Sequence, residues 1–202
     1  VRPKIDRVTF HMEAAQRQGY PHFMLKEIHE QPEVLAKMLK LRLKAGRAVL
    51  EGLGLSGTAL KAITRIKVVA CGTAYHAGLV GRYIIEELAG VPVDVDVSSE
   101  FRYRTLLVDR KTLVVAVSQS GETADTLAAI REARKKGAKV VSICNVIGSS
   151  LARESDGVLY THAGPEIGVA STKAYKAQLL MFYLFALKLA EVHKGLAPKI
   201  RS

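Results

Sequence analysis

The sequence predicts an α/β fold, a doubly wound five-stranded parallel sheet with an N-terminal helical extension. From residue 66 onward, short apolar or β-branched runs alternate with helix-length amphipathic segments. The first, third and fourth of these runs are almost continuously apolar, as expected for parallel strands covered on both faces. The residues before them have helical periodicity. We therefore divide the chain into a helical segment, 1–65, and a sheet domain, 66–202.

The N-terminal segment is expected to contain two helices. The first spans His22–Gln31, and Pro32 fits the first turn of the second, which runs through Leu50. Gly52–Gly57 contains three glycines and is expected to be a loop. The second helix has apolar residues at helical spacing: Leu35, Met38, Leu39 and Leu43.

Strands and helices then alternate. Two amphipathic helices are expected at Tyr75–Leu88 and Glu122–Lys136, each with glycine just beyond its end. A last helix, Thr172–Val192, is apolar on nearly all sides, so we expect it to be buried on most faces, with a subunit or domain interface covering the surplus. The expected strands are Ile66–Ala70, Pro92–Val97, Thr112–Val117, Lys139–Cys144 and Val158–Thr161.

Composition and charge exclude several classes of protein. The 202 residues include 30 Lys and Arg against 19 Asp and Glu, which gives a net charge of +11. The basic residues are spread from Arg2 to Arg201, and no Trp offers a stacking platform for bases. We therefore expect no nucleic-acid partner. Cys71 and Cys144 are too few for a disulfide framework and are expected to be reduced. Val1–His22 is polar, unlike a signal peptide, and no apolar stretch reaches the ~18 residues that span a bilayer. We expect a cytoplasmic protein with no membrane partner.

Three small turns with Ser or Thr at the start of a helix carry the functional signal. They are Cys71–Ala74 after the first strand, Ser118–Thr123 after the third, and Glu166–Lys173 before the last helix. Ligands of an open parallel sheet bind beyond the carboxyl ends of its strands, where backbone N–H groups, helix dipoles and hydroxyls suit a phosphate monoester. Ser120 is expected to open its helix, with Thr123 in the first turn. The competing interpretation is that Ser120 and Ser171 only cap their helices.

Other kinds of site lack their motifs. Neither G-x-G-x-x-G after the first strand nor G-x-x-x-x-G-K-[ST] occurs, and G-x-S-x-G is also absent, so nucleotide binding and a serine hydrolase are disfavoured. The histidines lack metal-ligand spacing, and we expect no metal and no cofactor. His76 and His162 are placed close to the edge of the predicted site, where capping or packing is the favoured interpretation.

The segment Ser118–Thr123 resembles the signature of sugar isomerase (SIS) domains, which bind phosphosugars on a flavodoxin-like fold. From about Phe10 onward, the chain is similar to the family of isomerising glutamine–fructose-6-phosphate aminotransferases, the glucosamine-6-phosphate synthases. The segments that carry this narrower resemblance are His22–Pro32, Cys71–Thr73, Ser99–Tyr103 and Glu166–Lys173.

The resemblance implies a role for each turn. In the family, the position after Thr73 is commonly Ser, whereas this chain has Ala74 and lacks that hydroxyl. The residues that would hold the sugar phosphate are Thr73, Ser118, Gln119, Ser120 and Thr123, with the backbone of Cys71 and Gly72 beside them. The residues that would contact the sugar are Val169, Ala170 and Ser171.

The reaction implied by the resemblance is amination of fructose 6-phosphate by glutamine, followed by isomerisation to glucosamine 6-phosphate. The family places its catalytic groups in a second SIS half and a C-terminal tail, and begins with a glutaminase domain. This chain shows only the first SIS half, so we expect it to bind sugar phosphate weakly without turnover. Glu166 is at most supporting, and Glu122 is interpreted as a complement to the helix dipole. The expected partners are the missing domains and a second copy in a homodimer.

Two other functions stay open. One is a non-enzymatic phosphosugar sensor joined to a helix-turn-helix, because Leu53–Ile63 superficially resembles such a turn, although few polar residues follow before Ile66. The other is a complete small phosphosugar isomerase that supplies its own base and histidine, His76 or His162, across a dimer.

Overall fold

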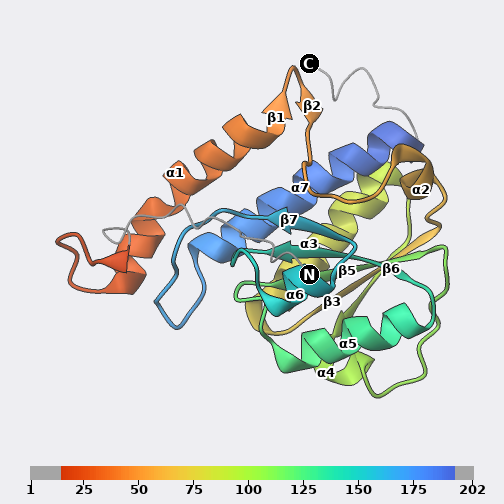
Figure 1. Cartoon of the computed structure of the whole chain (residues 1–202). Helices are drawn as coiled ribbons and strands as arrows, with labels where there is room; N and C mark the ends of the chain where they lie inside the picture. The colour runs from red at the N-terminus through yellow and green to blue at the C-terminus, as the bar shows by residue number, and fades with distance from the viewer. Residues whose placement is uncertain (1–14, 194–202) are drawn as a thin grey trace, which may run out of the picture.

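A computed structural model describes residues 15–193, which form an open parallel sheet with helices on both faces (Figure 1). The sheet has the order β4-β3-β5-β6-β7, and each neighbouring pair is parallel. Counted along the chain, this is the 2-1-3-4-5 order of flavodoxin-like folds, so the predicted fold class is confirmed. Arg2, Arg201 and the start of the polar Val1–His22 stretch lie outside the described residues. The strands are β3 (Arg65–Ala70), β4 (Val93–Val97), β5 (Thr112–Ser118), β6 (Lys139–Cys144) and β7 (Gly157–Tyr160).

Burial explains why the strands differ in composition. The central strand β5 is buried along its whole length, and its run is apolar throughout the middle. The edge strand β4 instead alternates valine with aspartate. Asp94 on β4 pairs with Lys67 of the neighbouring β3 at 2.7 Å, and this ion pair holds the pKa of Asp94 below its usual range. Continuous burial therefore marks the strands at the centre of the sheet.

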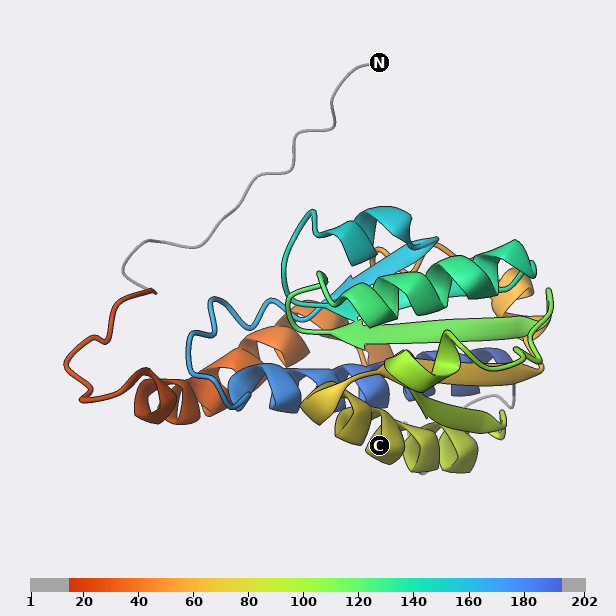
Figure 2. The same ribbon diagram turned by 90° about the horizontal axis from the view of Figure 1, so that it is seen from below.

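Helices cover the sheet in two layers (Figure 2). On one face α3 (Gly72–Ala89) and α7 (Lys173–His193) pack against each other and against the larger apolar core. On the other face α5 (Ala124–Lys135), α4 (Ser98–Phe101) and α6 (Ser150–Glu154) enclose the smaller core. Within residues 15–193, no helix is long and apolar enough to cross a membrane.

The N-terminal segment differs from the expectation of two helices running to Leu50. One helix, α1 (Phe23–Arg42), passes through Pro32 without a break, because packing along α7 outweighs the hydrogen bond that proline cannot donate. The chain then forms a hairpin of β1 (Leu43–Lys44) and β2 (Arg47–Ala48). Its turn residues, Ala45 and Gly46, both have positive φ, as a tight hairpin turn requires.

The apolar last helix is covered within the chain. α1, the short helix α2 (Gly57–Lys61), the hairpin strand β2 and α3 all pack against α7. The expected subunit or domain interface is therefore not what covers most of this helix. Among the large apolar side chains of α7, Tyr183 is half exposed.

The close approach of α3 to α7 depends on a glycine. A Cβ on Gly81 would lie 2.5 Å from ring atoms of Phe182, which is fully buried in α7. We expect Gly81→Ala to lower the free energy of unfolding by about 1–3 kcal/mol, because the ring cannot move aside in a filled core. Urea unfolding measures this change.

Gly57→Ala is the matched control, since Gly57 is also a helical residue, the first of α2, but a Cβ there would meet no heavy atom within 4 Å. Its unfolding midpoint should stay the same or rise slightly. Equal midpoints for Gly81→Ala and the unmodified chain would contradict the packing described here.

Candidate functional site

A cavity of about 380 Å³ opens at the carboxyl edge of the sheet, between the ends of β3 and β5. This is the point at which the strand order reverses, where open α/β sheets form their ligand crevice. The volume lies within the range of small-molecule sites. All the predicted binding residues line the cavity: Cys71, Gly72 and Thr73; Ser118, Gln119, Ser120 and Thr123; Val169, Ala170 and Ser171. The structure thus brings the three turns together, and their contact with a ligand stays a prediction.

Three helices begin at the wall of this cavity. α3 starts at Gly72, α5 starts directly after Thr123, and α7 starts at Lys173, the last residue of the third turn. None of the described residues that line the cavity is Lys or Arg. The starts of α3 and α5 have no side-chain cap, so their backbone N–H groups and helix dipoles, together with the hydroxyls of the turns, are the groups that favour an anion here.

The turn after β5 is a structured loop, which corrects the expectation that Ser120 opens the helix with Thr123 in its first turn. The helix begins at Ala124, and Thr123 occupies the N-cap position without a side-chain capping bond. The Ser118 hydroxyl accepts a hydrogen bond from the Gly121 N–H at 3.0 Å and lies 3.2 Å from the Thr123 hydroxyl. The Ser120 hydroxyl accepts from the N–H of Glu122 at 3.2 Å. These bonds fold the loop around the cavity.

Gly121 allows this loop to lie against the end of β6. Its φ is +70°, and a Cβ there would lie 2.2 Å from the Ser149 hydroxyl and 2.7 Å from the Cys144 sulfur. Cys144 is buried, and burial raises the pKa of its thiol. It contacts the Ser149 hydroxyl at 3.3 Å. The thiol therefore acts as packing beneath the loop rather than as a nucleophile.

Glu122 does not complement the dipole of α5, which is a second correction. It precedes that helix, and its carboxylate accepts a hydrogen bond from the Ser150 N–H at 2.8 Å, at the start of α6. This bond lowers the pKa of Glu122. The carboxylate thus ties the loop to a different helix.

Glu166 caps the last helix, a role that the sequence suggested for Ser171. One carboxylate oxygen accepts hydrogen bonds from the backbone N–H groups of Thr172 and Ala174, at 2.9 and 3.1 Å. The other accepts from the Ser171 hydroxyl at 2.9 Å. Glu166 therefore fixes the shape of the third turn. Because both of its carboxylate oxygens already accept hydrogen bonds, it is poorly placed to act as a general base.

Gln178 also lines the cavity, although it is not among the residues predicted from the sequence. It lies on α7, is 2% exposed, and its amide oxygen is buried without a partner among the described residues. Its place as the polar residue directly before the apolar run 179–187 was the available signal. Ala74 and Val117 line the cavity as well, and neither side chain offers a hydrogen-bonding group.

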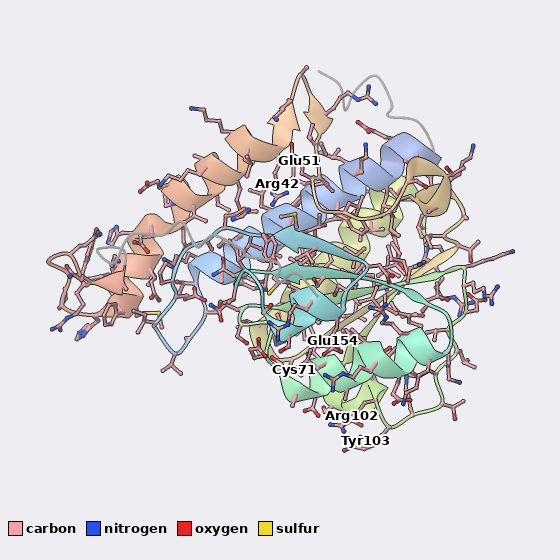
Figure 3. The ribbon with its side chains drawn as sticks, viewed as in Figure 1. Arg42, Glu51, Cys71, Arg102, Tyr103 and Glu154 are labelled. Atoms are coloured by element: carbon pink, nitrogen blue, oxygen red, sulfur yellow. The ribbon has the colours of Figure 1, made fainter. Side chains whose placement is uncertain are left out.

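The two histidines placed near the predicted site do not line it. His76 lies on α3 and packs edge-on against Tyr75. His162 lines a separate, larger cavity of about 680 Å³ beside the edge strand β7, together with Arg42, whose guanidinium donates to the Tyr160 carbonyl. Figure 3 shows Arg42 and Glu51 well apart from Cys71. That cavity carries acidic as well as basic side chains, so it suits a phosphate dianion less well.

Fold and cavity together define an open α/β domain with a ligand-sized crevice at its strand-order reversal. The family model of the SIS domain matches residues 59–188, and the chain belongs to the SIS domain family.

The chain is also similar to longer proteins. It is 54% identical over 200 residues to the isomerising glutamine–fructose-6-phosphate aminotransferase of Clostridium tetani, and 56% identical over 200 residues to that of Symbiobacterium thermophilum. Each alignment covers 98% of this chain but 33% of the relative, so the chain spans about a third of the length of these proteins.

A solved structure agrees with the sequence comparison. The C-terminal domain of glucosamine-fructose-6-phosphate aminotransferase from Francisella tularensis has a TM-score of 0.84 and 44% identity, over 91% of this chain and 51% of that one. The predicted resemblance is thus confirmed.

His162 makes a pH-dependent contribution to stability. Its partial burial and the nearby Arg42 lower its pKa from 6.5. The unfolded chain therefore takes up a proton below about pH 6.5 that the folded protein resists, so stability falls as pH decreases through that range. We expect His162→Asn, which tolerates the φ of 51° at this position, to lose less stability than the unmodified chain between pH 7.5 and pH 5.5 in urea unfolding. Equal losses in the two proteins would contradict this assignment.

Proposed function

We propose that this chain is the phosphosugar-binding half of the isomerase region of an isomerising glutamine–fructose-6-phosphate aminotransferase. In this proposal it binds fructose 6-phosphate and glucosamine 6-phosphate. The observation that carries the proposal is the convergence of three helix N-termini and their hydroxyl-bearing turns on one cavity. The names of the relatives support the choice of substrate.

The two sides of the cavity suit the two parts of such a ligand. The turn Ser118–Thr123 and the start of α3 offer N–H groups and hydroxyls to the phosphate oxygens. The turn with Val169–Ser171 also lines the cavity and is left for the sugar. Residues 66–202 would therefore form the binding domain, with 1–65 as its N-terminal helical segment.

Turnover is assigned to parts of the protein beyond this chain. Glu166, the carboxylate next to the cavity wall, is engaged in capping α7, and the lining residues offer neither a lysine nor a carboxylate. A second SIS half and a glutaminase domain would supply the base, the ring-opening group and the ammonia. We further propose that the protein is a cytoplasmic homodimer.

The two alternatives gain less support. Leu53–Ile63 forms one five-residue helix after a hairpin, and strand β3 follows at once, so it lacks the second helix of a helix-turn-helix. A complete isomerase would need a histidine at the cavity, whereas His162 lines a different one.

Removing one hydroxyl of the phosphate turn tests the proposed site. Ser120 lines the cavity and is half-buried. We expect Ser120→Ala to weaken binding of fructose 6-phosphate and of inorganic phosphate by about tenfold, the value of one hydrogen bond to a charged group. Isothermal titration calorimetry measures both affinities.

Thr105→Ala removes an exposed hydroxyl outside the cavity and is the matched control, so it should leave both affinities unchanged. Equally weak binding of the two ligands, unaffected by Ser120→Ala, would refute the site.

The chain alone is expected to synthesise no glucosamine 6-phosphate, because the cavity lacks a general base and a ring-opening group of its own. A coupled assay with fructose 6-phosphate and an ammonium salt checks this, with binding of the sugar phosphate confirmed in the same preparation. A measurable synthesis rate that Ser120→Ala abolishes would overturn the division of labour proposed here.

A further inference from the structure

The motif His22–Pro32 contributes no residue to the lining of the cavity. It forms the first turns of α1, which lie beside the loop that precedes α7 (Figures 1 and 2). Two of its charged side chains are almost fully buried, Lys26 at 2% and Glu27 at 1% exposure. Burying charges is costly unless they are paired, so their contacts call for an explanation.

Glu27 binds the backbone of the sugar-facing turn. Its carboxylate accepts a hydrogen bond from the Ile167 N–H at 2.6 Å. It also accepts from the Gly168 N–H, with distances of 3.2 and 3.1 Å to its two oxygens. Hydrogen bonds to an ionised carboxylate are stronger than neutral ones. A helix more than 130 residues away in sequence therefore holds the two residues that come directly before Val169.

Gly168 is required for this contact. A Cβ at this position would lie 2.6 Å from a carboxylate oxygen of Glu27 and 3.5 Å from the Cα of Met24. Any side chain would therefore push the turn away from α1. The hydrogen bonds of Glu27 therefore require glycine at position 168.

A second contact holds the other end of the turn. Glu30 accepts from the ammonium group of Lys173, the first residue of α7, at 2.6 Å, and lies 3.3 Å from that of Lys26. The side chain of Lys173 is 3% exposed. α1 thus binds the chain at Gly168 and again at Lys173. These two positions flank Val169–Ser171, the three residues of the turn that line the cavity.

Two of those three residues have little packing of their own, while the Ser171 hydroxyl donates to Glu166. Val169 is fully exposed, and Ala170 is also exposed. A turn without a buried side chain takes its position from its anchors. We propose that Glu27 is a positioning residue that sets Val169–Ser171 against the sugar, so that α1 is part of the binding site. This inference rests on the proposed function of the cavity.

Glu27→Gln tests the proposal. The variant keeps the shape of the side chain, but its NH₂ group faces backbone donors in place of a carboxylate oxygen. We expect affinity for fructose 6-phosphate to fall by about tenfold or more, the value of a charged hydrogen bond. Affinity for inorganic phosphate should stay within about twofold, because the phosphate side of the cavity shares none of these contacts.

Two further variants separate positioning from folding. Gly168→Ala displaces the carboxylate from the loop side and should reproduce the selective loss of sugar phosphate affinity. Glu33→Gln alters an exposed residue of the same helix, paired with Lys37, and should change neither affinity. Hydrogen exchange of the 165–172 segment gives a readout without ligand, and it should rise in Glu27→Gln and Gly168→Ala.

The outcomes are distinct. If the unmodified chain binds neither ligand, the proposed function fails, whatever the variants do. If it binds both, and Glu27→Gln with Gly168→Ala bind fructose 6-phosphate normally, the positioning role is refuted and the site stands. An equal loss for both ligands also refutes it, since a general loss of stability would act on both.

Discussion

The parallel pairing of β3 with both β4 and β5 is the constraint on which the site depends. Because the strand order reverses there, α3 leaves β3 toward one face of the sheet and α5 follows β5 on the other. The two helices diverge, and the space between their N-termini cannot be filled by either. α7 then closes the third side from the layer of α3. The cavity is thus a consequence of topology, and the side chains of the turns only decide what enters it.

The surface carries charged side chains in ion pairs, whereas the cavity is lined by uncharged hydrogen-bonding groups. Within residues 15–193, most basic side chains are at least partly exposed, and surface pairs such as Arg131 with Glu154 contribute little to stability. The cavity uses backbone N–H groups and hydroxyls on helices that are already ordered. Donors of this kind need no long side chain to be immobilised when a ligand binds, which lowers the entropic cost of binding. A net charge of +11 therefore says little about where an anion would bind.

The sequence pattern predicted the elements whose composition is determined by their own burial, such as the central strands and the turns that follow them. The continuous burial of β5 and β6 forces apolar runs, so the strands could be located closely, and their ends carried the turns now found together. The single helix through Pro32 could not be predicted, because its cause is packing on α7. The exact start of α5 and the contacts of Glu122 depend on α6 in the same way. Long-range contacts leave no periodic trace in a sequence.

The contacts of Glu27 show how this limit bears on function. The SIS family model matches residues 59–188 and leaves α1 outside, and a division at residue 65 does the same. Yet a buried carboxylate of α1 and the ion pair between Glu30 and Lys173 hold the turn that lines the cavity. Burial of these charges would be unfavourable unless the turn supplied their partners, so helix and turn stabilise each other. A family boundary drawn on the sheet therefore excludes a helix whose charges complete one wall of the cavity.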